Sequence, residues 1–152
     1  MEKELTRFFD TSLTNALRNL KEDSKAKWGT MTAKQMLIHL IQSSKMMHFG
    51  NNTLLIKEEY VEKAIAFLYS DKAIKKGLVV PNDIGFNFTN NNEDIEELKA
   101  ELINSSNNMI NFLTENTEFK AIHPFFGELT AAQWSIFQRK HYIHHLSQFG
   151  LL

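Results

Sequence analysis

The chemistry that this sequence offers is concentrated in its histidines. Of the six histidines, three lie within five residues near the end of the chain: His141, His144 and His145. Residues four apart share one face of a helix, so His141 and His145 can direct their imidazoles toward one point. In this way a single helix supplies two nitrogen ligands to one metal ion. A third ligand must then come from another segment.

His39 is the leading candidate for the third ligand. On a helical wheel of about 100° per residue it lies at the edge of an apolar arc, with Ser43 beside it. Three imidazole nitrogens from two helices leave one coordination position open, which is typical of catalytic metal sites. Such a site would suit a divalent ion, nickel or zinc, held by His39, His141 and His145.

Other assignments of the histidines stay open. His144 is three residues from His141 and could replace either member of the pair. His48 lies half a turn away from His39 and cannot share its site, while His123 precedes Pro124 at the entrance to a turn, where capping or packing is favoured. Each histidine taken alone is also explained as an ordinary polar residue satisfied in or near a core.

The residue pattern of the last helix predicts that the histidine pair faces the interior of the bundle. With His141 at zero on the wheel, Trp134 lies near 20°, His145 near 40°, Gln148 near 340° and Phe137 near 320°, at about 100° per residue. The histidine pair therefore lies in an aromatic-lined stripe. We expect the surroundings of the ligands to include Gln148, Trp134, Ser43 and His144. No catalytic residue is assigned, because the histidine face carries no identifiable general base.

Most segments of the chain, including those that carry these residues, have apolar side chains at helical spacing. Six glycines and two prolines in 152 residues are few breakers. Helical periodicity, with capping boxes at Thr32–Gln35 and Thr130–Gln133, predicts helices at about 5–20, 32–48, 57–68, 93–114 and 130–149. Residues 77–92 are typical of a loop, and no alternating pattern is strong enough to predict a strand.

These elements predict an all-α protein with a single domain over residues 1–152. The economical architecture is a four-helix bundle, with a long connection and one extra short helix between its second and third members. A chain of this length buries roughly 70% of its unfolded surface, enough for an ordinary core.

Composition excludes several classes of function. The chain has no cysteine, so a metal must be held by histidine or carboxylate. A net charge of -1 offers no basic field for nucleic acid. Apolar runs are far shorter than the roughly 20 residues of a membrane span, and the charged start lacks the apolar core of a signal peptide. We expect a soluble, cytoplasmic protein.

Two blocks of the chain carry a resemblance to a known family. The first is Trp28-Gly-Thr-Met-Thr-Ala-Lys-Gln35-Met-Leu-Ile-His39-Leu. The second joins His123-Pro-Phe-Phe-Gly-Glu-Leu-Thr130-Ala-Ala-Gln-Trp134 to Lys140-His141-Tyr-Ile-His144-His145-Leu-Ser-Gln148-Phe-Gly150. Together they resemble an uncharacterised domain family within the DinB-like superfamily.

This resemblance implies a four-helix bundle whose nickel or zinc ion is held by one histidine of the second helix and a His-x-x-x-His pair of the last. Carried over, it implies His39, His141 and His145 as ligands, with Gln148 in the place of the polar residue that follows the pair. The chain departs from the common pattern at Leu146-Ser147, where Arg-Gly is usual.

The resemblance also implies a class of reaction. Enzymes of the superfamily conjugate or isomerise substrates with low-molecular-weight thiols, so we expect a metal-dependent transferase or hydrolase acting on a small molecule. In a chain without cysteine the thiol would arrive as a cosubstrate. The alternative is a non-catalytic helical module that binds a metal or a ligand.

A second apolar face on the last helix bears on assembly. Ile136 and Ile143 lie near 220° and 200° on the same wheel, with Leu146 near 140°, at about 100° per residue. This face needs a partner, either the connection 51–92 folding back or the same face of a second protomer in a homodimer.

Overall fold

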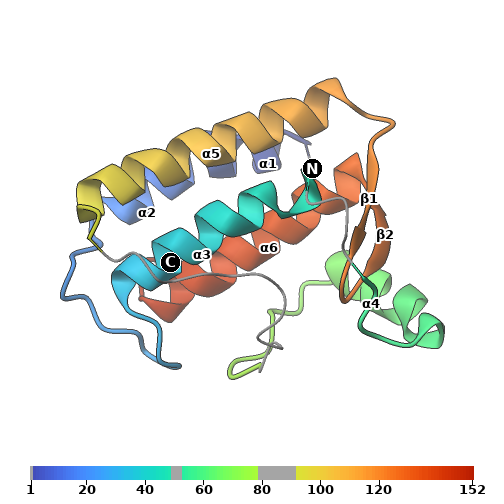
Figure 1. Ribbon diagram of the computed structural model, residues 1–152, viewed down its shortest axis with the longest axis horizontal. Coiled ribbons are helices and arrows are strands. Elements are labelled where there is room, and N and C mark those ends of the chain that lie inside the picture. Colours follow the sequence, from blue (N-terminus) through green and yellow to red (C-terminus); the bar gives the residue numbers. More distant parts are fainter. Residues whose placement is uncertain (1, 49–52, 79–91) are drawn as a thin grey trace.

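Helices make up most of the computed structural model, which describes residues 2–48, 53–78 and 92–152 (Figure 1). The first predicted helix is confirmed as a continuous rod, but it is not uniform. It comprises α1 (Glu2–Arg7), a π-helical stretch η1 (Phe8–Ser12) and α2 (Leu13–Leu17). A π turn is wider than an α turn, so it shifts the buried stripe of a helix.

Two capping boxes begin the helices that carry the candidate ligands, as predicted. Thr32 accepts a hydrogen bond from the backbone of Gln35, whose side chain accepts one from the Thr32 N–H, and α3 (Ala33–Lys45) follows. A 3-10 turn, η2 (Met46–His48), continues it. Thr130 and Gln133 repeat the arrangement before α6 (Ala131–Gln148).

The remaining helices also follow the predicted periodicity. The 3-10 turn η3 (Glu58–Tyr60) leads into the short helix α4 (Val61–Leu68). The long helix α5 (Ile95–Glu115) begins at Asp94, whose carboxylate accepts hydrogen bonds from two backbone N–H groups. Of the predicted loop at 77–92, residues 79–91 lie outside the described residues.

The prediction of an all-α protein is wrong. Strands β1 (Lys120–His123) and β2 (Gly127–Thr130) form an antiparallel hairpin, with Lys120 opposite Thr130 and His123 opposite Gly127. Strands of four residues are too short for alternation to stand out from a helical background. The turn does contain a hairpin signal, because Gly127 closes a three-residue loop with a φ of +73°.

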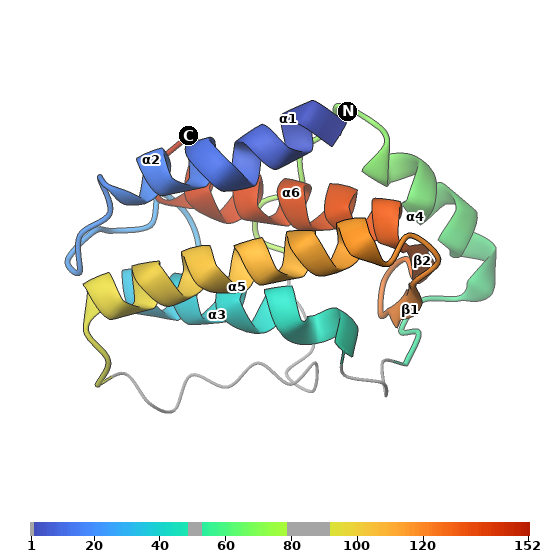
Figure 2. The same ribbon diagram turned by 90° about the horizontal axis from the view of Figure 1, so that it is seen from above.

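The long helices lie side by side, as Figures 1 and 2 both show. The rod α1–α2 lies beside α5, α3 contacts both α5 and α6, and the hairpin and α4 cover the end where α6 begins. The core between these helices is built from fully buried side chains, among them Phe9, Leu13, Met36, Leu40, Leu102, Trp134, Tyr142 and Leu146. Within the described residues, no helix combines the length and apolar character needed to cross a bilayer.

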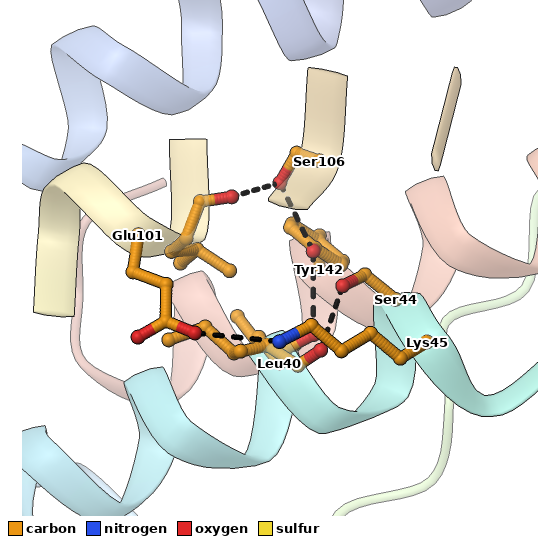
Figure 3. A network of polar contacts seen from close by, with 8 residues as sticks. Leu40, Ser44, Lys45, Glu101, Ser106 and Tyr142 are labelled. Carbon is orange, nitrogen blue, oxygen red and sulfur yellow. Dashed lines mark hydrogen bonds and ion pairs between the residues drawn. The ribbon is translucent and has the colours of Figure 1, made fainter. Parts of the chain in front are cut away.

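A buried polar network fixes α3 and α6 at the level of the candidate ligands (Figure 3). The Tyr142 hydroxyl lies 3.3 Å from the Leu40 carbonyl oxygen and 3.0 Å from Ser106 Oγ on α5. Burial raises the pKa of Tyr142, so the hydroxyl keeps the proton that it donates to the Leu40 carbonyl oxygen. Since Tyr142 follows His141 and Leu40 follows His39, the network holds both ligand-bearing helices at a set separation.

Candidate metal centre

Three imidazoles converge between α3 and α6. His39 Nε2 lies 2.9 Å from His141 Nε2, which lies 3.0 Å from His145 Nε2. One nitrogen from each ring can be chosen such that all three lie within 4.8 Å of one another. The three predicted ligands are therefore positioned to bind a metal ion.

The tautomer of His145 follows from its neighbours. Gln148 Nε2 donates to the Trp28 carbonyl oxygen at 2.8 Å, which leaves Gln148 Oε1 facing His145 Nδ1 at 2.9 Å. Because an amide oxygen only accepts, His145 must carry its proton on Nδ1. Its Nε2 lone pair is then directed at the other two histidines.

Gly29 makes room for this arrangement. Its φ is +77°, and a Cβ at this position would lie 2.7 Å from Gln148 Nε2. The Trp28-Gly29 turn thus supplies both the carbonyl that orients Gln148 and the space that Gln148 occupies.

A second chain of hydrogen bonds sets the tautomer of His141. Gln138 Nε2 donates to the Ser43 carbonyl oxygen at 2.8 Å, so Gln138 Oε1 accepts from the Ser43 hydroxyl at 3.2 Å. Ser43 Oγ lies 3.0 Å from His141 Nδ1, and with its own proton engaged it accepts from that nitrogen. His141 therefore also presents an Nε2 lone pair, and both Ser43 and Gln138 are fully buried.

With these two tautomers, the lone pairs of His141 and His145 point into the site and can bind a cation. Two imidazole lone pairs facing each other at 3.0 Å repel unless a positive centre lies between them. A tetrahedral site with Zn–N bonds of roughly 2.0–2.1 Å separates its nitrogens by about 3.3 Å, close to the observed spacing. Hydrogen bonds on the outer nitrogen of a ligating histidine are also the usual support of metal sites.

Burial keeps these histidines neutral, as metal binding requires. Burial, reinforced by His145 and His144, lowers the pKa of His39 to about 3. Burial lowers the pKa of His145 to about 4, although the Gln148 hydrogen bond acts in the opposite direction. Burial and the neighbouring histidines hold the pKa of His141 well below its usual value.

The match to a known protein family covers nearly the whole chain. Residues 4–150 match the family described as "Protein of unknown function (DUF1569)". The chain belongs to this family. No curated protein matches it. No solved structure matches it either.

In this DUF1569 chain, His144 lies beside the three convergent histidines and is not one of them. Its ring lies 5.0 Å from that of His145 and 5.8 Å from that of Trp28. Burial lowers its pKa, a hydrogen bond with the main chain of Ile74 raises it, and Lys76 lowers it further. The structure therefore favours the His-x-x-x-His pairing over the His-x-x-His alternative.

The other two histidines also lie outside the group. His48 is exposed and packs on the Phe112 ring at 4.6 Å. His123 is buried in the hairpin, where Nδ1 accepts from the backbone N–H of Phe125 at 3.1 Å. Both positions agree with the sequence-based expectation that neither shares the site with His39.

Of the two aromatic residues predicted to line the histidine stripe, Phe137 contacts a candidate ligand, whereas Trp134 contacts other rings. Trp134 is fully buried and donates to the Ala121 carbonyl oxygen, while its ring contacts His123 and Phe137. The ring that touches the site is Phe137, stacked on His141 at 5.4 Å and 16°. Sequence reasoning missed Gln138 altogether, because its role depends on Ser43 on another helix.

Proposed function

We propose that the protein binds one divalent ion, zinc or nickel, through His39, His141 and His145 and acts on a small molecule as a metal-dependent transferase or hydrolase. The observation that carries the proposal is the convergence of three Nε2 atoms, two of them with lone pairs fixed by hydrogen bonds on the opposite nitrogen. Three protein ligands leave a coordination position for an exogenous group.

The metal would supply one kind of chemistry, since a bound thiol or water loses its proton more readily and serves as a nucleophile. The protein's own residues act through geometry. Ser43 and Gln148 hold the Nδ1 protons of His141 and His145, and Phe137 covers one face of the His141 ring. A thiol must come from outside, because the chain has no cysteine.

The resemblance to the DinB-like superfamily supports this proposal. It relates the largely helical fold, one histidine from α3 and a pair from α6 to metal-bearing bundles that use small thiols. Membership of that superfamily, a small-molecule substrate and a cytoplasmic location are parts of the same proposal.

A non-catalytic metal-binding module is the second candidate, and one observation favours it. The charges that shift the pKa values of the buried histidines are those of other histidines and of Lys76. No carboxylate is among the causes of these shifts, and no general base is assigned to the site.

Metal analysis of protein purified without an affinity tag tests the proposal. We expect one zinc or nickel ion per wild-type chain and almost none in His39→Ala, His141→Ala or His145→Ala. His144→Ala is the matched control, because it removes an adjacent imidazole on the same helix, and it should keep the ion. Loss of metal from His144→Ala with retention in His145→Ala would refute the assigned ligand set.

The coordination sphere separates the two candidate functions. Cobalt(II)-loaded protein whose absorption spectrum changes on addition of a small thiol has an open position, as the enzyme requires. A spectrum that indicates four protein ligands and does not respond to thiols favours the non-catalytic module.

A further inference from the structure

Two side chains of α6 bind directly to the main chain of α3. Tyr142 donates to the Leu40 carbonyl oxygen at 3.3 Å, and Gln138 Nε2 donates to the Ser43 carbonyl oxygen at 2.8 Å. Gln138 and Tyr142 lie four apart and thus on one face of α6, where both are fully buried. We call these two hydrogen bonds the clamp.

The clamp lies at the level of the candidate ligands. His141 is placed between Gln138 and Tyr142 on α6, and His39 directly precedes Leu40 on α3. Two hydrogen bonds at different points along a pair of helices restrict both their separation and their tilt. Because each bond ends on a main-chain carbonyl, which cannot turn independently of its helix, the clamp sets the position of the α3 backbone relative to α6.

The separation of the helices matters most for His39. His141 and His145 belong to one helix, so helix geometry sets their spacing. His39 approaches them from α3, and its Nε2 lies 2.9 Å from His141 Nε2. The bond lengths of a metal site vary by only about 0.2 Å. A shift of α3 by more than this would weaken the bond from His39 while leaving the other two intact.

Of the two clamp residues, Tyr142 allows the cleaner test. Gln138 also accepts from the Ser43 hydroxyl that orients His141, so its loss would change a tautomer and a distance together. The Tyr142 ring packs edge-on against Phe9 at 5.2 Å, and its hydroxyl contacts Ser106 on α5 as well as Leu40 (Figure 3). Tyr142→Phe therefore removes the bond to α3 and keeps the ring in its packing.

We propose that Tyr142 is a positioning residue of the metal centre, and that its hydroxyl holds His39 at the distance from His141 and His145 that a bound ion requires. This inference rests on the proposed function, because it requires an ion held by these three histidines. Without the hydroxyl all three ligands remain, but α3 is free to shift relative to α6.

Zinc affinity and the spectrum of cobalt(II)-loaded protein test the inference. Competition with a chelator should show zinc affinity about 10-fold lower in Tyr142→Phe than in wild type, the lower end of the usual effect of losing a group that supports a metal ligand. The visible bands of cobalt(II) report the geometry of its ligands, so they should also change. Urea unfolding of the metal-free proteins measures the loss of stability separately.

Ser106→Ala is the matched control. It removes the other partner of the Tyr142 hydroxyl, on a helix without a candidate ligand, and leaves the bond to Leu40. We expect the metal-free protein to lose stability in both variants, since each loses a buried hydrogen bond. Ser106→Ala should nevertheless keep zinc affinity within about twofold of wild type and leave the cobalt spectrum unchanged.

Wild-type affinity and spectrum in Tyr142→Phe would overturn the inference and leave the proposed function standing. Equal losses of affinity in Tyr142→Phe and Ser106→Ala would also overturn it, because the network would then support the fold alone. A wild-type protein that binds neither zinc nor cobalt refutes the proposed function, and this inference fails with it.

Discussion

The two histidines of α6 differ from ordinary buried histidines in what holds their outer nitrogen. His141 is held by Ser43 and His145 by Gln148, and each chain of hydrogen bonds ends at a main-chain carbonyl. A carbonyl cannot reverse its role from acceptor to donor, so the order of donors is fixed along both chains. The result is a site whose lone pairs are set before any ion arrives.

Ser43→Ala tests whether this preorganisation matters. Without the hydroxyl, His141 loses its acceptor and Gln138 loses its donor, so the imidazole is free to change tautomer. We expect zinc affinity to fall by about 10-fold to 100-fold, the usual effect of removing a group that supports a metal ligand. Competition titration with a chelator measures the affinity, and ¹⁵N spectra of the imidazoles report the tautomer.

Ser44→Ala is the matched control for that experiment. Ser44 is also buried on α3, where its hydroxyl donates to the Ile41 carbonyl oxygen and lies beside the Tyr142 hydroxyl, but it touches no candidate ligand. Its removal should leave zinc affinity within about twofold of wild type, in line with an ordinary intrahelical bond. Equal losses in both variants would mean that Ser43 supports the fold and not the ligand.

Sequence reasoning predicted the three histidines that converge in the candidate site, but not all the residues that hold them. Helical spacing within α6 placed His141, His145 and Gln148 on one face, which is a local property of a helix. Gln138 was missed because its role depends on Ser43, 95 residues earlier in the chain. Pairings between helices depend on how those helices pack, and periodicity within one helix does not determine that packing.

Among the helices and strands, the predictions that rest on strong local sequence signals are correct, whereas elements with weak signals were missed. Both capping boxes form as their residue types predict, since each satisfies backbone groups within four residues. The hairpin of β1 and β2 was missed because its stability depends on contacts with the rest of the fold, and the π-helical turn in the first rod has no comparable sequence signature.

Gly29, in the connector before α3, is the subject of the next prediction. Gly29→Ala places a Cβ 2.7 Å from Gln148 Nε2, so Gln148 must turn away from Trp28 and His145. The positive φ alone costs roughly 1–2 kcal/mol of stability. We expect zinc affinity to fall by about 10-fold in addition, through the loss of the group that orients His145.

Gly77→Ala separates these two effects. Gly77 has a similar φ of +70°, but a Cβ there meets nothing within 4 Å. Thermal unfolding should show a similar loss of stability in both variants, whereas only Gly29→Ala should lose zinc affinity. Retention of full affinity in Gly29→Ala would show that Gln148 is not needed to orient His145.

The stability of the whole molecule should depend on pH through His123. Burial lowers its pKa from 6.5 to about 3, so the folded protein keeps it neutral while the unfolded chain binds a proton below pH 6.5. Stability is therefore lost as the pH falls through this window, at about 1.4 kcal/mol per pH unit for one proton. His39, His141 and His145, whose pKa values burial also lowers, add to the same dependence on pH. His123→Phe should therefore reduce the wild-type slope by the share of one proton, in urea-unfolding free energies measured between pH 6 and 4.

The control for this slope is His48→Phe, which removes an exposed histidine that packs on Phe112. This variant shows what the same replacement does to the slope at an exposed position. The loss of the Phe125 hydrogen bond lowers the absolute stability of His123→Phe, but it does not alter the number of protons that the slope counts. A slope that matches wild type in His123→Phe would refute the assignment.

Assembly is the remaining question at the scale of the whole molecule, and it concerns the second apolar face of α6. Ile136 and Ile143 pack against the core of their own chain, yet both remain partly exposed. We propose a homodimer in which a two-fold axis pairs Ile136 with Ile143 of the partner subunit. Sedimentation should then give a dimer for wild type and a monomer for Ile136→Glu/Ile143→Glu, since two buried charges oppose association.

Ile122→Glu, a change at an exposed isoleucine of β1, should leave the dimer intact. A monomeric wild type would end this proposal, and packing within the chain would then account for both isoleucines.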